Sequence, residues 1–321
     1  MSKEKTERAR LLCLARDGKC SLSRLLVKAA DWREPMPAEL KQLVLDKASF
    51  DGLDVAFFAL DENLTHKYVP KAMKHCLVID KSSAYRLKED VPLVVPEVNP
   101  EQVARHKNLI ATPNCTTIPL VMVLAPLHRK FGLQRVILSS YQSASGAGRD
   151  AVDEYYYETE FIALRRAVER PDDSPFPIQL ADNVIPQIGK FQGDGYSVEE
   201  HKTMSETRKI LALPGLAITA TCVRVPVAVG HALSVAAEFA EPVSPKQAHD
   251  VLAKASGVEV LNPECYPTPV EAAGRDEVLV GRIRKDSSNP RGLVLWICTD
   301  NLRKGAATNA VQIAELALRK D

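Results

Sequence analysis

The sequence lacks three features that would each mark a class of protein: an excess of charge of one sign, closely spaced cysteine pairs, and a long apolar run. Lysine and arginine number 42 against 41 for aspartate and glutamate, so no net field attracts nucleic acid or an anionic membrane surface. No stretch approaches the length of a membrane span, and no apolar segment follows the charged N-terminus. We therefore expect a cytoplasmic protein that binds a small molecule and neither nucleic acid nor a membrane.

The cysteines exclude two further classes. They number seven, which is odd, and no two of them form a C-x-x-C pair. A disulfide framework uses paired cysteines and a zinc site uses closely spaced ones, so neither is indicated. We expect reduced thiols and no bound metal.

What the sequence does contain is enough apolar material for two domains. Its 321 residues are 45% hydrophobic, which allows a large buried core. Between residues 11 and 110, short apolar runs alternate with helix-like polar stretches. This alternation is typical of βαβ units around a buried parallel sheet, and it predicts an α/β first domain.

The pattern changes after Cys115. The longer strand candidates there cover residues 135–140, 217–226 and 232–239, and the helical segments between them cover 151–169 and 197–211. These predict a mixed sheet with helices on one face. A last helix, near 306–319, has apolar residues at helical spacing, and we expect it to return to cover the first domain.

Cys115 has the surroundings of a reactive thiol. It stands before the strongly apolar stretch 120–127, so we predict it at the first turn of a buried helix, where Pro119 is tolerated. Unpaired N–H groups at a helix start stabilise an anion and lower the pKa of a thiol, and a thiolate is the nucleophile that acyl transfer needs. The alternative is a buried structural cysteine. The polar neighbours Asn114 and Thr116 count against that alternative.

Two later segments carry further candidates. Gly146 and Gly148 lie in a glycine-rich turn after a strand, where backbone can approach a ligand closely. Arg224 lies within an apolar strand, and a buried charge there needs an anionic partner, such as a substrate carboxylate. His231 follows a glycine, and taken alone it could equally be a satisfied core or surface histidine.

Taken together and in order, these motifs resemble the aspartate-semialdehyde dehydrogenase family. The resemblance runs from about Phe50 to the C-terminus. It is carried by residues 82–86, 94–99, 113–115, 141–142, 145–148, 206–209, 224–226, 230–231, 266–269 and 300–306. It implies a shortened Rossmann-like, dinucleotide-binding type of domain at residues 1–114, with the C-terminal helix 303–321 packing back on it, and an α+β catalytic and dimerisation domain at residues 115–302.

The resemblance also implies a catalytic mechanism. Cys115 would be the nucleophile on the acyl phosphate of L-aspartyl-4-phosphate, His231 the acid and base, and Gln142 the group that orients the thioacyl intermediate. NADPH would then reduce this intermediate to aspartate semialdehyde. No metal takes part.

Five further residues would bind the substrate. By resemblance, Arg224 would bind its α-carboxylate and Glu199 its amino group, while Arg86 and Lys202 would hold the departing phosphate, and Asn114 lies beside the nucleophile. Guanidinium groups match carboxylate and phosphate, and a carboxylate pairs with an ammonium. From spacing alone, Glu199 and Lys202 would instead be a solvated pair on a helix surface.

The cofactor NADP(H) is expected from the resemblance, and part of its site departs from the family pattern. Near the nicotinamide end, Ser145, Gly146, Gly148 and Asn301 are present. The glycine turn that would meet the pyrophosphate retains only Gly18.

Further departures fall on the same ligand. Asp17 adds a negative charge beside Gly18, and a second nucleotide-contacting turn, residues 59–63, is bulky and acidic. The stretch between Leu26 and Phe50, which should grip the 2′-phosphate, is shorter than the family pattern. These changes predict weakened NADP binding.

Three functions therefore stay open at this point. The first is NADPH-dependent reduction of the Cys115 thioester in amino-acid biosynthesis. The second is a redox-independent acyl transferase or hydrolase that uses the same thioester. The third is a non-catalytic relative, although the retained nucleophile counts against it. The resemblance further implies a homodimer or homotetramer.

Overall fold

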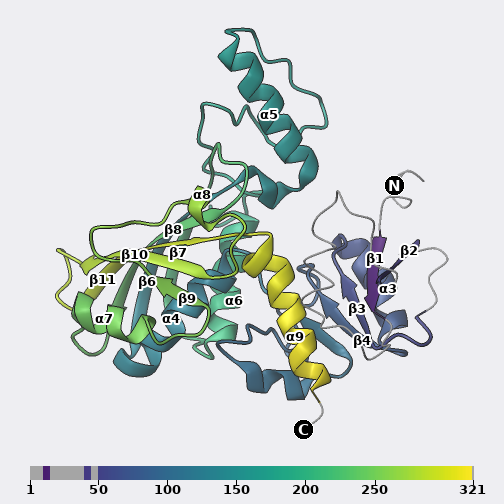
Figure 1. Cartoon of the computed structure of the whole chain (residues 1–321), viewed down its shortest axis with the longest axis horizontal. Helices are drawn as coiled ribbons and strands as arrows, with labels where there is room; N and C mark the ends of the chain where they lie inside the picture. The colour runs from purple at the N-terminus through teal and green to yellow at the C-terminus, as the bar shows by residue number, and fades with distance from the viewer. Residues whose placement is uncertain (1–9, 15–39, 45–49, 320–321) are drawn as a thin grey trace. The chain divides into compact units, whose positions relative to one another are not determined.

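The computed structural model describes residues 10–14, 40–44 and 50–319 (Figure 1). The chain divides into two compact units. The first unit is Met1–Asn114 with Ala306–Asp321, and the second unit is Cys115–Gly305. No helix among the described residues is both long enough and apolar enough to cross a membrane.

The first unit is built on a five-stranded sheet. Its strands, in the spatial order β2-β1-β3-β4-β5, are β2 Leu40–Val44, β1 Arg10–Leu14, β3 Val55–Phe58, β4 Leu77–Asp80 and β5 Leu109–Ala111. The pairs β3–β4 and β4–β5 are parallel, which confirms the predicted parallel sheet for this part. All residues of these three strands are buried, as expected for parallel strands covered on both faces.

The N-terminal side of this sheet differs from a parallel arrangement. β1 pairs antiparallel with both β2 and β3. An apolar run reads the same whichever way its strand points, so the sequence pattern could not show this reversal. A parallel β1–β3 pair would need a crossover that returns the chain to the starting edge, whereas an antiparallel pair does not.

Helices complete the first unit. α3 (Glu62–Ala72) connects β3 to β4, the 3-10 helix η2 (Pro100–Arg105) precedes β5, and α9 (Thr308–Leu318) ends the described chain. α9 contributes Ala310, Ile313 and Ala314 to the core cluster that includes β3, β4 and β5 residues. The amide of Asn309 also donates to the carbonyl of Val94 over 3.0 Å.

The second unit is built on a mixed six-stranded sheet, as predicted. Its strands, in the spatial order β7-β6-β8-β11-β10-β9, are β7 Ala217–Arg224, β6 Leu133–Gln142, β8 His231–Phe239, β11 Gly292–Thr299, β10 Val278–Lys285 and β9 Val258–Val260. β6–β7 and β9–β10 are parallel, and the other neighbouring pairs are antiparallel. Burial alternates along β7, so the sheet has one covered face.

The helices of this unit begin and end at recognisable residues. α4 (Thr117–Phe131) is buried along most of its length and packs against α6 (Val198–Ile210) and α7 (Pro245–Leu252). Ser197 and Glu200 form a capping box at the start of α6, which confirms the predicted helix there.

Four shorter or peripheral helical segments complete the described chain between the strands. They are η3 (Ala144–Ala147), α5 (Arg149–Ala163), α8 (Pro269–Ala272) and the π-helix η4 (Arg303–Ala307). Figure 1 shows α5 extending away from the sheet of its unit. The helix predicted over 151–169 ends earlier, because Arg165 takes a left-handed conformation with φ of 54°.

Candidate functional site

The sheet of the second unit brings the predicted catalytic side chains to one edge. Gln142 ends β6 and Arg224 ends the parallel strand β7, where the two residues are register partners. β8 runs antiparallel to β6, so its first residue, His231, lies at the same edge. β11 ends there as well, since Thr299 pairs with His231. Residues far apart in sequence therefore converge because of strand direction.

Cys115 lies at this edge, just before α4. The structure places it one residue before the N-cap Thr116, so it lies outside the first turn of the helix rather than within it. The thiol is partly exposed, unlike Cys222 and Cys298, which are buried. Gly305 packs directly against it, since a Cβ on Gly305 would lie 3.3 Å from the Cβ of Cys115. Cys115 is thus packed against Gly305 while the residue as a whole stays partly exposed.

The sulfur of Cys115 lies 3.4 Å from Nε2 of His231. The imidazole is completely buried, and burial, together with the charge of Arg224, lowers the pKa of His231 to about 3. Its other nitrogen, Nδ1, accepts the backbone N–H of Ser143 over 3.1 Å. The pair is a thiol and a neutral histidine at hydrogen-bonding distance, an arrangement that can supply an activated nucleophile.

Arg224 brings a buried positive charge to this pair. Its Nη1 donates to the carbonyl oxygen of Ser143 over 2.6 Å. Burial lowers the pKa of Arg224, and the charges of Cys115 and Glu199 oppose that effect. Gly146 lacks a side chain where one would collide, because its Cβ would lie 2.8 Å from Nη1 of Arg224 and 3.1 Å from Nε2 of His231. The turn glycine therefore allows the guanidinium and the imidazole to meet.

Gln142 and Glu199 complete the same cluster. The amide of Gln142 donates to Oγ of Ser140 over 3.1 Å and to Oε1 of Glu199 over 3.3 Å. Glu199 is buried in the first turn of α6, so it is not one half of a solvated helix pair. Lys202 lies half-buried on the same helix, three residues further on.

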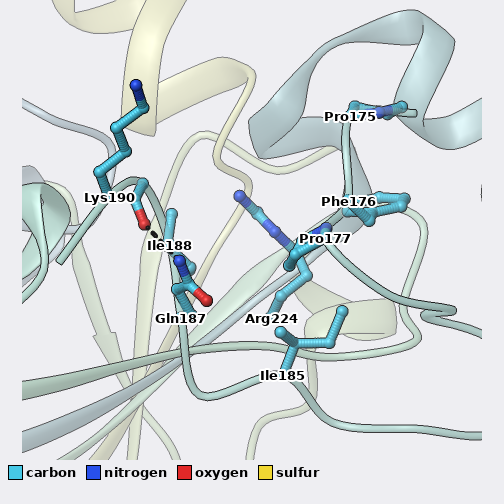
Figure 2. Close-up of a pocket in the computed structure, with 9 residues that line it drawn as sticks. Pro175, Phe176, Pro177, Ile185, Gln187, Ile188, Lys190 and Arg224 are labelled. Atoms are coloured by element: carbon cyan, nitrogen blue, oxygen red, sulfur yellow. Dashed lines mark hydrogen bonds between the residues drawn. The ribbon is translucent and has the colours of Figure 1, made fainter. Parts of the chain in front are cut away.

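A pocket of about 220 Å³ opens beside Arg224 (Figure 2). It is lined by Pro175, Phe176, Pro177, Ile185, Gln187, Ile188, Gly189, Lys190 and Arg224. Its walls are largely apolar, and Arg224 supplies a buried cation. Arg224 is fixed here through its backbone, which pairs with Ile185 by hydrogen bonds of 2.8 and 2.9 Å. The sequence patterns did not reveal residues 175–177 as part of a site. This Pro-Phe-Pro run, called the proline wall below, forms one side of the pocket.

A buried ionic cluster holds the proline wall in place. The carboxylate of Glu158 on α5 is fully buried and lies 3.1 Å from Nε of Arg170. Its other oxygen accepts the backbone N–H groups of Leu180 and Ala181 over 2.8 and 2.9 Å. Glu154 lies 3.5 Å from the same guanidinium nitrogen. α5 therefore anchors the chain on both sides of the proline wall, at Arg170 before it and at Leu180 and Ala181 after it.

The other predicted binding residues belong to different parts of the chain. Arg86 and Asn114 are buried residues of the first unit, and Arg86 donates to the carbonyl oxygen of Lys81 over 2.6 Å. Gly18 lies outside the described residues. Ser145 and Asn301 are buried in the second unit and hydrogen-bond to each other over 2.9 Å.

Two observations concern the cofactor region of the first unit. The carboxylate of Asp61 accepts the N–H of Leu64 over 3.0 Å, so the chain itself places an anion at the start of α3. The carboxyl end of β1 points to the opposite edge from the carboxyl ends of β3, β4 and β5. For metals, no group of three or more potential ligand side chains occurs among the described residues.

Two family models match the chain. One described as "Semialdehyde dehydrogenase, dimerisation domain" matches residues 124–304, and one described as "Semialdehyde dehydrogenase, NAD binding domain" matches residues 21–106. The second match begins after Gly18, so the altered glycine turn falls outside it.

Comparison with individual proteins gives the same family. The chain is 48% identical over 278 residues to aspartate-semialdehyde dehydrogenase of Aquifex aeolicus, covering 85% of this chain and 81% of that protein. The crystal structure of aspartate semialdehyde dehydrogenase II complexed with ASA from Vibrio cholerae matches with a TM-score of 0.86 at 40% identity, covering 89% and 86% of the two chains. Aspartate semialdehyde dehydrogenase with NADP from Candida albicans matches with a TM-score of 0.63 at 25% identity, covering 83% and 77%. As its motifs indicated, the chain belongs to the aspartate-semialdehyde dehydrogenase family of oxidoreductases.

Proposed function

We propose that this chain forms a thioester on Cys115 from the acyl phosphate of L-aspartyl-4-phosphate. The observation that carries this proposal is the approach of the Cys115 sulfur to Nε2 of His231, 3.4 Å away, beside the buried cation of Arg224. The thiolate attacks the acyl carbon and forms the C–S bond, while the C–O bond to phosphate breaks and phosphate leaves with the electron pair. The imidazole stays within reach to donate a hydrogen bond to the carbonyl oxygen.

The substrate's amino-acid end has matching partners. Arg224 pairs with the α-carboxylate, and buried Glu199 pairs with the amino group. Gln142, which bonds to Glu199, orients the thioacyl carbonyl. The apolar pocket of about 220 Å³ beside Arg224 limits the size of the group attached to the carboxylate. Lys202 and Arg86 hold the departing phosphate in this proposal, and Asn114 lies next to the nucleophile in the chain.

The family's reaction continues with reduction of the thioester by NADPH to aspartate semialdehyde, and this is the leading proposal for the whole activity. The dinucleotide match over residues 21–106 and the NADP-bound relative support it. Two observations on the described residues of the first unit count against tight binding of that cofactor, however. Asp61 places a carboxylate at the start of α3, in a turn that would contact the nucleotide. The carboxyl end of β1 lies at the opposite edge from the carboxyl ends of β3, β4 and β5, where dinucleotides bind.

These two observations favour a second candidate function. A redox-independent acyl transferase or hydrolase would form the same thioester and pass the acyl group to water or an amine. The thiolate would then leave when the new nucleophile attacks the acyl carbon. The third candidate, a non-catalytic relative, gains no support from a cysteine and histidine held at hydrogen-bonding distance.

Calorimetric titration with NADPH separates the first two candidates. The assay is repeated with the acyl phosphate while phosphate and aspartate semialdehyde are measured. Binding of NADPH together with semialdehyde formation supports the dehydrogenase. Release of phosphate without NADPH binding, at a rate above that of uncatalysed hydrolysis, supports the transferase or hydrolase. No release of phosphate by the intact enzyme in either condition contradicts both.

We also propose that the chain assembles as a homodimer through its second unit, alone or within a homotetramer. The match to a dimerisation domain over residues 124–304 supports this. Ile137, on the sheet strand β6, is 40% exposed, Arg135 two residues before it is also exposed, and its register partner Thr219 on β7 is half-buried. Sedimentation of the wild type should give a dimer or larger, and Ile137→Asp should shift it toward a monomer. A monomeric wild type contradicts the proposal.

A further inference from the structure

The hydrogen bonds of His231 determine where its proton lies. A backbone N–H can only donate, and the N–H of Ser143 points at Nδ1 over 3.1 Å. Oγ of the same serine also lies 3.1 Å from Nδ1, and a hydroxyl can donate as well as accept, so it is the backbone N–H that assigns Nδ1 as an acceptor without a proton. In the neutral ring the single proton then lies on Nε2, which is the nitrogen that faces the sulfur of Cys115.

A network around Asn301 holds this donor in place. Oδ1 of Asn301 accepts the backbone N–H of Gly230 over 2.9 Å, which identifies this atom as the oxygen and settles the orientation of the amide. The same oxygen lies 3.1 Å from Oγ of Ser143, and Nδ2 donates to Oγ of Ser145 over 2.9 Å. The buried amide of Asn301 thus connects Gly230, the residue before His231, to the turn that contains Ser143 and Ser145.

We propose that Ser143, held by Asn301, fixes His231 as an Nε2–H donor, so that Arg224 and not a protonated imidazole is the counter-ion of the Cys115 thiolate. Ser143 and Asn301 are positioning residues in this scheme. The inference rests on the proposed role of Cys115 as a nucleophile. It assigns Asn301 to the support of His231, a role separate from the cofactor contact that the resemblance implies.

The charges around the sulfur agree with this assignment. A thiolate that accepts the Nε2–H of a neutral ring keeps its full negative charge and needs a cation nearby. Arg224 is that cation, since its charge interacts with Cys115, and Gly146 leaves room for its guanidinium beside the imidazole. Glu199 from α6 is the acidic group that faces Arg224 among the described residues, and its charge raises the pKa of the guanidinium.

The chemical consequence concerns the acylation step. In this scheme the Cys115 thiol gives its proton to solvent before the substrate arrives, so no proton passes from sulfur to His231 during attack. When the substrate's carboxylate binds to Arg224, it takes over part of the cation that stabilised the thiolate. The thiolate becomes more reactive at the moment when the acyl carbon is in place.

Nitrogen NMR of the intact protein labelled with ¹⁵N-histidine tests the tautomer directly. The chain has seven histidines, and His231→Gln identifies the signal of His231 by its loss. We expect a proton on Nε2 and none on Nδ1 at neutral pH. A signal with protons on both nitrogens, or with the proton on Nδ1, overturns the inference. Asn301→Ala should broaden or split this signal, because the turn that carries the Ser143 donor loses its support. An unchanged signal in Asn301→Ala would show that Asn301 does not position the ring.

Alkylation of Cys115 by iodoacetamide at a series of pH values tests the counter-ion. Arg224→Gln should raise the pH midpoint by roughly one to three units, the effect of losing an opposite charge at close range. His231→Gln should raise it by less, and Arg224→Lys, which keeps the charge, should also stay closer to the wild type. Exposed Cys265, followed in the same samples, is the internal control. A larger shift for His231→Gln than for Arg224→Gln overturns the inference.

Neither measurement depends on turnover, so the two proposals can fail separately. If Cys115 forms no acyl adduct while the tautomer and the alkylation midpoints are as expected, the proposed function is wrong and the ionisation of the pair stands. If the adduct forms while His231 carries two protons, the function stands and this inference is wrong.

Discussion

Replacing Gly146 by alanine tests whether the site depends on the close approach of Arg224 and His231. The new Cβ would lie 2.8 Å from Nη1 of Arg224, and ordinary contact begins near 3.4 Å, so the guanidinium must retreat by about 0.6 Å. The present hydrogen bond from Nη1 to Ser143 is 2.6 Å long and would be broken or badly stretched by that movement.

The size of the effect is set by the bond that is lost. A hydrogen bond to a charged group contributes about 1.5–3 kcal/mol, so we expect kcat/KM for the acyl phosphate to fall roughly 10- to 150-fold. The assay is phosphate release at low substrate concentration. Gly193→Ala is the matched control, because a Cβ there meets nothing within 4 Å. A Gly146→Ala enzyme as active as Gly193→Ala would refute the argument that this glycine makes room for the catalytic groups.

Three further predictions concern stability, pH and the position of the thiol. Glu158→Gln should lower the free energy of unfolding by about 3 kcal/mol in urea titrations, because it removes the nearer of the two buried carboxylates that pair with Arg170. Exposed Glu160→Gln on the same helix should change little, and equal values would contradict the buried ion pair. His231 has a folded pKa of about 3 against 6.5 ordinarily, so the unfolded state binds the extra proton and stability should fall as pH drops below 6.5. Relative to His231→Gln, the wild type should lose up to about 1.4 kcal/mol more per pH unit in that range, and parallel curves would contradict a neutral buried ring. Gly305→Ala places a Cβ 3.3 Å from that of Cys115, so alkylation of Cys115 should slow severalfold relative to Gly193→Ala, and an unchanged rate would show that the contact does not hold the thiol.

Much of the fold is predictable from local patterns in the sequence. The strands predicted at 135–140 and 232–239 match β6 and β8 to within three residues at each end, because one-sided burial imposes an alternating pattern. The strand predicted over 217–226 ends at Arg224, just before Pro226. The direction of β1 has no such signature, since an apolar strand reads alike in both directions.

The site was predictable as a set of residues more than as an arrangement. Cys115 and His231 are 116 positions apart, so spacing along the chain gives no reason for them to meet. They meet because β6, β7, β8 and β11 bring their ends to one edge, and that edge depends on the order and direction of all the strands in the sheet. The proline wall at 175–177 was missed because an irregular segment has no periodicity to detect. The network of Asn301 was missed because a buried amide and a ligand-binding amide look the same in a sequence.

The central claim is that Cys115 carries the acyl group, and mass spectrometry of the protein mixed with L-aspartyl-4-phosphate in the absence of NADPH tests it most directly. The account predicts one aspartyl adduct per chain, mapped to Cys115 and formed together with one equivalent of phosphate. Cys265→Ser should retain this adduct and Cys115→Ser should lose it. An unmodified wild type, or an adduct that persists in Cys115→Ser, would contradict the account.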